Sequence, residues 1–285
     1  MAIFSRIAFA SYAFQTAAGL IFVPLQEDRF FDLCGSLGFV LTNLVSIYLP
    51  GAQLNHLSSG DIRAKVLSPR RFLLNAVLNA WAIRLGSFLL SRALRHGGDS
   101  RFAEVKKSKM RFAVAWIAQA TWVFAVGLPV YLVNSVPSAA DPPLTIADYA
   151  SLAFLASSWM FELVADYQKS VWRQAKEKKQ HDEKFVTRGL WAISRHPNHV
   201  GEVGIWTGVW ALSIPALKAN APLAGEYTWL VAGISPLTTY LLTRYISGVP
   251  PLEKQADQRF GEDPKWKEYK RNVSIFWPWV RPSSD

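Results

Sequence analysis

The sequence predicts an all-α membrane protein, a polytopic bundle of about seven transmembrane helices. Of the 285 residues, 51% are hydrophobic and only 18% are charged, whereas a soluble domain of this size carries about 25% charge. Seven windows are long and apolar enough to cross a bilayer, which takes about 20 residues. The predicted spans are residues 6–24, 33–50, 72–91, 112–134, 145–165, 199–216 and 227–246.

The first three windows each contain one informative residue. Only Arg6 precedes the first apolar run, and no cleavage site of small residues follows it, so we expect a retained helix. The second window holds the single cysteine, Cys34, which can form neither an intrachain disulfide nor a Cys-based zinc site and is expected to be buried. The third contains Arg84, which is expected either to face a polar cavity or to snorkel to the membrane surface.

Prolines and charged residues in the second half of the chain separate the remaining windows. The proline-rich connection from Val136 to Pro143 predicts a turn. The charged stretch from Trp172 to Lys184 is interpreted as a solvated continuation of the fifth helix, and Pro197 suits the first turn of the sixth. Most tryptophans are expected in the interfacial belt or facing lipid. These are Trp116, Trp122, Trp159, Trp191, Trp206, Trp210 and Trp229.

The basic residues predict the orientation in the membrane. Of the 31 Lys and Arg residues, 24 lie on the face formed by residues 25–32, 92–111, 166–198, 244 and 247–285, and six on the other. Cytoplasmic loops hold such an excess, so we expect an odd number of spans with the C-terminus cytoplasmic, in the endoplasmic reticulum if the cell is eukaryotic. The net charge of +10 lies in blocks between apolar runs, which argues against nucleic-acid binding.

The densest polar cluster follows the fifth window and extends to the sixth. Asp166 and Lys169 share one helical face at the membrane boundary. Arg195 and His196 precede the predicted helix start at Pro197, where unpaired N–H groups and the helix dipole attract anions. Glu202 then falls one turn into that helix. This combination predicts a site for a phosphorylated cofactor, and a loop pinned by hydrogen bonds is the structural alternative.

Three separated motifs, in the right order, resemble the steroid 5-alpha-reductase superfamily, and in particular the broad membrane branch that shares its C-terminal region with sterol reductases. The central motif is Phe185 to Trp210 (FVTRGLWAISRHPNHVGEVGIWTGVW), preceded by Asp166 to Lys169. The others are Trp81 to Lys107 and Ser247 to Val273. The resemblance covers about residues 35–280. We expect a single membrane domain, 1–285, and the resemblance implies that its cofactor-binding half occupies about residues 145–280.

This resemblance implies an NADPH-dependent reductase of a carbon–carbon double bond conjugated to a carbonyl. Its lipophilic substrate (a steroid, sterol or fatty enone) enters from the bilayer. Carried over by motif, the implied cofactor-binding residues are Asp166, Lys169, Arg188, Arg195, His196, Asn198, His199, Glu202, Tyr240, Arg244 and Glu253. No metal is implied, and the resemblance leaves the substrate and the oligomeric state open.

Two departures from the family pattern affect the chemistry. His199 stands where the family commonly has Tyr. The tyrosine and glutamate that polarise the substrate carbonyl in steroid 5-alpha-reductases have no clear counterpart, since the third window offers Trp81 and Arg84 instead. Arg84 and Tyr48 are the candidate catalytic residues, with Glu27 or Asp32 as further candidates for the proton donor.

Two other functions compete with a reductase. An isoprenylcysteine- or phospholipid-type methyltransferase is similar over the Arg-His-Pro region but uses S-adenosylmethionine. The cluster at Asp166 to Lys169 and the tail at Ser247 to Val273 argue against it. A non-catalytic membrane protein that kept the fold is the third class, supported by His199 alone.

Overall fold

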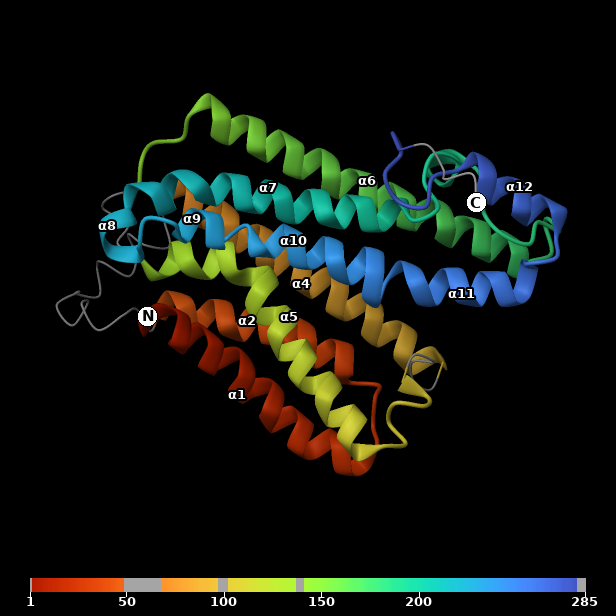
Figure 1. The fold of residues 1–285 in the computed structure, drawn as a ribbon, viewed down its shortest axis with the longest axis horizontal. Coiled ribbons are helices and arrows are strands. Elements are labelled where there is room, and N and C mark those ends of the chain that lie inside the picture. Colours follow the sequence, from red (N-terminus) through yellow and green to blue (C-terminus); the bar gives the residue numbers. More distant parts are fainter. Residues whose placement is uncertain (1, 49–67, 97–101, 137–140, 281–285) are drawn as a thin grey trace. The chain divides into compact units, whose positions relative to one another are not determined.

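A computed structural model describes residues 2–48, 68–96, 102–136 and 141–280, which are helical with short connections (Figure 1). They form two compact units. The first comprises Met1–Thr145 and Val209–Ser235, and the second comprises Ile146–Gly208 and Pro236–Asp285. The sequence predicts a single domain, 1–285; most of the predicted cofactor-binding half, 145–280, belongs to the second unit.

Four long helices build most of the first unit. They are α1 (Ala2–Leu25), α2 (Phe31–Tyr48), α4 (Pro69–His96) and α5 (Lys109–Ser135). Helix α5 packs against α1, α2 and α4, and α2 also contacts α1 and α4. Aromatic rings fill the junctions, where Phe39 meets Trp81 and Trp122 edge-on at centroid distances of 5.2 and 4.8 Å. Cys34 is buried, as predicted.

Polar side chains inside this unit are paired across the helices. The Asn134 amide donates to Asn43, Ser46 and Asn75 at 2.9–3.0 Å. Near the start of α4, Arg71 is fully buried and donates to both carboxylate oxygens of Asp141 at 2.7 and 3.1 Å. Helix ends and polar residues in an apolar bundle need such partners, because lipid offers none.

The second unit begins with α6 (Ile146–Glu177) and contains the first half of α7 (Pro197–Ala219). These two helices approach closely along glycines of α7. A Cβ atom on Gly201 would lie 2.8 Å from the backbone nitrogen of Glu162, and one on Gly208 would lie 2.7 Å from the Cβ of Leu155. Helix α7 begins at Pro197, as predicted, so Arg195 and His196 immediately precede its N-terminus.

The chain then breaks into short elements before the C-terminal helices. These are α8 (Ala221–Ala224), α9 (Thr228–Val231), α10 (Ile234–Leu241) and a π-helical turn, η5 (Leu242–Ile246). Two amphipathic helices follow, α11 (Val249–Phe260) and α12 (Pro264–Asn272).

The fold class is the predicted one, but fewer helices qualify as spans than the predicted seven. Among the described residues, five helices are long and apolar enough to cross a membrane: Phe4–Leu25, Phe31–Tyr48, Pro69–Ser91, Lys109–Ser135 and Pro197–Ala219. The predicted span 145–165 is the start of α6, a 32-residue helix that carries buried Asp148 and Glu162 and is not among these five. The predicted span 227–246 is interrupted at Ala232 and Gly233.

The structure also bears on two further predictions from the sequence, the placement of the tryptophans and the turn from Val136 to Pro143. The interfacial or lipid-facing placement is wrong for Trp116, Trp191 and Trp206, which are at most 3% exposed and belong to the interior. Their large apolar surfaces fill the gaps between helices instead. Of the predicted turn from Val136 to Pro143, residues 137–140 lie outside the described part of the chain.

Candidate functional site

The centre of the candidate site is an ion pair between the loop before α7 and the start of α11. Arg195 donates to Glu253 from Nε at 3.3 Å and from Nη2 at 2.9 Å. Its Nη1 donates to the backbone carbonyls of Lys270 and Val273 at 3.1 and 3.0 Å. The side chains of Arg195 and Glu253 are only 8% and 13% exposed. Four of the five guanidinium hydrogens are therefore used inside the protein.

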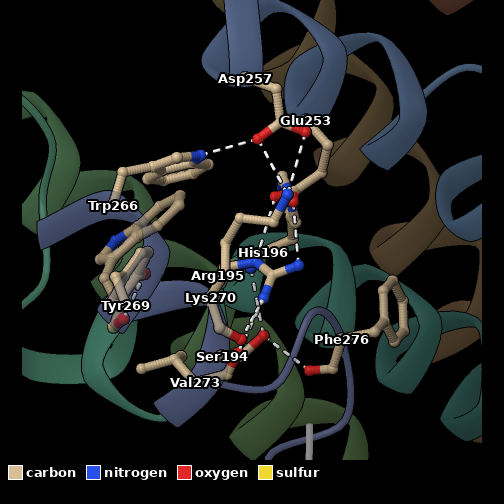
Figure 2. A network of polar contacts seen from close by, with 11 residues as sticks. Ser194, Arg195, His196, Glu253, Asp257, Trp266, Tyr269, Lys270, Val273 and Phe276 are labelled. Atoms are coloured by element: carbon tan, nitrogen blue, oxygen red, sulfur yellow. Dashed lines mark hydrogen bonds and ion pairs between the residues drawn. The ribbon is translucent and has the colours of Figure 1, made fainter. Parts of the chain in front are cut away.

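His196 contacts the same carboxylate (Figure 2). Its Nε2 lies 2.8 Å from Oε1 of Glu253. Burial lowers the pKa of His196 to about 4, although Glu253 acts in the opposite direction, so the imidazole is neutral at pH 7. Burial acts to raise the pKa of Glu253, but the hydrogen bond from His196 and the charge of Arg195 together hold that pKa below its ordinary value. An ionised Glu253 only accepts hydrogen bonds, so Nε2 carries the proton.

The C-terminal tail is tied to this loop by backbone contacts. The amide of Arg195 donates to the carbonyl of Ser274 at 2.8 Å, within an isolated parallel bridge between Ser194 and Ser274. The Ser194 hydroxyl donates to the carbonyl of Phe276 at 2.6 Å, and Tyr269 donates to the carbonyl of Trp191 at 2.6 Å. The loop and the tail therefore hold each other in one conformation.

One turn beyond Glu253, Asp257 makes a second tie between α11 and α12 (Figure 2). It accepts from the Trp266 indole at 2.7 Å and from the Lys270 ammonium at 2.9 and 3.0 Å. Because Lys270 also supplies a carbonyl to Arg195, the two ties are connected through one residue.

Beside these ties lies a cavity of about 410 Å³, within the second unit. Six cationic side chains line it, together with one acidic side chain, that of Glu253, among its described lining residues. The cations are Lys169, Arg173, Lys176, Lys184, Arg195 and Arg259. Lys184 is paired with Asp263 at 2.7 Å and Arg195 with Glu253, but six cations against one carboxylate still give the described wall an excess of positive charge.

Three of these cations form a stripe on α6. Lys169, Arg173 and Lys176 are spaced i, i+4 and i+7, which places them on one face of the helix. The Lys169 ammonium lies 4.6 Å from the centroid of Trp191, and that of Lys176 lies 5.0 Å from the centroid of Trp172. As predicted, the stretch from Trp172 to Lys184 continues the helix with mostly exposed residues, but only as far as Glu177. The prediction missed that four of its residues also line the cavity: Trp172, Arg173, Lys176 and Lys184.

Aromatic rings supply the apolar part of the cavity wall. They are Trp172, Phe185, Trp191, Phe260, Trp266 and Tyr269. Phe185 packs edge-on against Trp266 at 5.0 Å, and the Trp191 indole donates to the carbonyl of Ala165 at 3.0 Å, so these rings are fixed by packing and hydrogen bonds. Such a wall can hold a planar heterocyclic ring beside a phosphate-binding surface.

The structure brings together some of the residues predicted from the sequence. Arg195, His196 and Glu253 contact one another, and Lys169 lines the same cavity. His199 and Glu202 form a second pair on α7, with Nδ1 to Oε2 at 3.6 Å, and the His196 and His199 rings lie nearly parallel, 6.0 Å apart. Asn198 is half-buried in the first turn of α7.

Other predicted residues lie elsewhere in the second unit. Arg188 is exposed, pairs with Glu183 at 2.8 Å and lines a neighbouring cavity. Asp166 is half-buried on α6, one turn before the stripe. The hydroxyl of Tyr240 lies 3.4 Å from that of Tyr245, and the guanidinium of Arg244 lies 4.8 Å from the centroid of Tyr245, around the π-helical turn.

The candidate catalytic residues belong to the first unit. Tyr48 ends α2 and is 57% exposed, and Arg84 is half-buried in the middle of α4. Asp32 lies in the first turn of α2. Glu27 bonds locally to Arg29, and this hydrogen bond lowers the pKa of Glu27 to about 2. Glu27 is therefore ionised at neutral pH and is unsuited to donate a proton.

Several residues that line the cavity were not among the site residues predicted from the sequence. Lys176, Lys184 and Arg259 lie in charged stretches that look like ordinary solvated helix faces. The lysine and arginine spacing on α6 was the available signal, but Trp266 and Phe260 gave none, because both pack against Phe185, which is distant in the sequence.

Comparison with known proteins gives one match. A family model described as "Protein of unknown function (DUF1295)" matches residues 20–273. No curated protein and no solved structure matches the chain.

Proposed function

This chain belongs to the DUF1295 family, and we propose that it is a membrane-embedded, NADPH-dependent reductase of lipid-like enones. The central observation is the cavity beside the Arg195–Glu253 ion pair, which combines an excess of cations with a wall of aromatic rings. The motif from Phe185 to Trp210 supports the proposal through its resemblance to steroid 5-alpha-reductases.

The charges of the cavity fit the phosphates of NADPH. Arg173 and Lys176 lie on α6 and Arg259 on α11, so cations line it from two helices. Lys and Arg bind phosphate through charge-assisted hydrogen bonds, and guanidinium groups can do so with two N–H groups at once. NADPH offers a pyrophosphate and a ribose phosphate to such a surface.

The uncharged groups of the cavity also fit a dinucleotide. Trp172 is the least buried of the three lining tryptophans and offers a ring on which an adenine or a nicotinamide can stack, while the buried Trp191 and Trp266 add apolar surface. His196 lines the same cavity, and its Nδ1 is buried without a hydrogen-bond partner among the described residues. A buried acceptor of this kind is costly unless a ligand satisfies it.

In the proposed reaction a hydride from NADPH and a proton add across the carbon–carbon double bond, so that NADPH is oxidised to NADP+ and the enone becomes a saturated carbonyl compound. The residues of the second unit bind and orient the cofactor, and Glu253 keeps Arg195 and His196 in place. Arg84 or Tyr48 stays the proposed partner of the substrate carbonyl, since each carries a hydrogen-bond donor.

The same cavity argues against S-adenosylmethionine. That cofactor carries a sulfonium, an ammonium and a carboxylate group and no phosphate, so its net charge is positive and a wall with cations such as Arg173 and Arg259 disfavours it. We therefore place the methyltransferase second.

Orientation and substrate access complete the proposal. The C-terminal helices α11 and α12 are amphipathic and carry many of the basic residues, and we place them in the cytoplasm. The lipophilic substrate reaches the protein from the bilayer, and the endoplasmic reticulum is the proposed compartment in a eukaryotic cell.

A binding measurement tests the proposal directly. Purified protein in detergent is titrated with NADPH, NADH and S-adenosylmethionine at low salt, with NADPH fluorescence and calorimetry as readouts. We expect NADPH to bind with micromolar affinity and S-adenosylmethionine not to compete. Tight binding of S-adenosylmethionine with no response to NADPH would exchange the order of the two functions.

A further inference from the structure

The unpartnered ring nitrogen of His196 points to a specific contact. Nε2 is occupied by Glu253 at 2.8 Å, while Nδ1 is buried with no hydrogen-bond partner among the described residues. The side chain is 5% to 7% exposed and lines the cationic cavity. Buried polar atoms in folded proteins are nearly always satisfied, so this nitrogen calls for a partner that the described part of the chain does not supply.

Glu253 decides what kind of partner that is. An ionised carboxylate only accepts, so it forces the proton of the neutral imidazole onto Nε2 and leaves a lone pair on Nδ1. Arg195, which donates to both oxygens of Glu253, keeps that carboxylate ionised and oriented. The missing partner must therefore be a hydrogen-bond donor, such as an amide N–H or a hydroxyl group.

The position of His196 along the cavity favours an amide donor. His196 directly precedes α7, which is long and apolar enough to cross the membrane, and the charge of Lys169 acts on the His196 ring, whereas Arg173 and Lys176 lie one and two turns further along α6. Phosphates bound at those outer cations leave the end near Lys169 for the nicotinamide, which has to meet a substrate in the bilayer.

We propose that His196 Nδ1 accepts a hydrogen bond from the carboxamide N–H of the nicotinamide, and that Glu253 is the positioning residue that keeps this nitrogen an acceptor. The proposal rests on the proposed function. The role of Glu253 is indirect, because its carboxylate already contacts Arg195 and His196.

The test compares two probes that differ in the donor. NADP+ carries a carboxamide, and its 3-acetylpyridine analogue replaces the amide nitrogen with a methyl group while keeping the carbonyl. We expect the intact protein to bind NADP+ about tenfold more tightly and His196→Ala to bind both equally. His181→Ala, which removes an imidazole that contacts the carbonyl of Trp172 instead, should keep the preference.

A second variant tests the positioning role without removing the ring. In Glu253→Gln the amide oxygen stays with Nη2 of Arg195, the shorter of the two contacts, so the amide nitrogen takes the place of Oε1, faces His196 and donates to Nε2, while Nε of Arg195 loses its acceptor. The ring proton then moves to Nδ1 and the preference for NADP+ is lost. Nitrogen-15 NMR of histidine-labelled protein without cofactor should show an unprotonated Nδ1 at His196 in the native protein and a protonated one in Glu253→Gln.

The outcomes separate the two proposals. Equal binding of both probes by the native protein, or a preference that survives His196→Ala, overturns this inference and leaves the reductase standing. A protonated Nδ1 in the native protein overturns it as well. Failure of the native protein to bind either probe overturns both.

Discussion

Arg195 and Glu253 are 58 residues apart in sequence and form a two-point ion pair, in which Nε and Nη2 meet the two oxygens of one carboxylate at 3.3 and 2.9 Å. The pair joins the loop before α7 to the first turns of α11, and His196 shares the carboxylate. The cavity wall therefore depends on a contact between segments that are distant in the chain.

Breaking this pair should destabilise the second unit. Removing one partner of a buried ion pair costs about 3 to 5 kcal/mol, because the other charge is left buried and uncompensated. We expect Arg195→Ala to lower the thermal unfolding midpoint of the cofactor-free protein in detergent. Arg188→Ala, which breaks an exposed pair with Glu183, is the matched control and should cost at most about 1 kcal/mol. Equal midpoints for the two variants would contradict this role.

The stripe on α6 should contribute binding energy and little stability. Arg173→Gln removes a charge that lines the cavity from an exposed position, so NADPH affinity should fall about tenfold, or about 1.4 kcal/mol, while the unfolding midpoint stays unchanged. The loss should shrink at high salt. Lys178→Gln, just beyond the end of α6, is the control. If both variants bind NADPH like the native protein, the stripe is not the phosphate surface.

Acidification should destabilise the protein through His196. Its pKa is about 4 in the folded state and about 6.5 in the unfolded state, so the unfolded chain binds more protons between those values and stability falls as the pH drops below 6.5. The expected loss is about 2 kcal/mol by pH 5. The lowered pKa of Glu253 acts in the same direction further into acid, where its stabilising charge is lost. Unfolding midpoints measured from pH 8 to 4.5 should decline less in His196→Gln, and identical slopes would rule His196 out.

The charge distribution predicts where the C-terminus lies. A reporter of compartment fused after Asp285 should read the cytoplasm, because most Lys and Arg residues gather on that face. The ion pair of Arg195 with Glu253 requires both residues to lie on one face, so the chain between them crosses the bilayer an even number of times, as in the seven-span prediction. A reporter placed in the lumen would mean that one long helix, such as α6, changes the parity.

The helices were largely predictable and their fine structure was not. Apolar windows predicted α1, α2, α4, α5 and α7, because crossing lipid demands long apolar runs. The same criterion failed for residues 227–246, which are apolar but interrupted near Gly233, where packing against Trp210 and local turns decide the conformation.

The motif suggested which residues belong to the candidate site, but the sequence did not predict the contacts between them. The position of Arg195 before a helix start suggested an anion ligand, whereas in the structure most of its hydrogens go to Glu253 and to two carbonyls of the tail. Sequence alone gave no pairing between residues so far apart. Lys169 was predicted, while Lys176 and Arg259 were missed because each looks like an ordinary surface charge.

The bridge between Ser194 and Ser274 has a consequence for biosynthesis. The chain is made from its N-terminus, so the membrane helices are complete while Glu253, Trp266 and the tail are still absent. Every newly made copy therefore passes through a stage in which it is inserted in the bilayer without a cavity. A premature stop between α11 and Phe276 would leave a protein that is inserted in the membrane but never acquires its site.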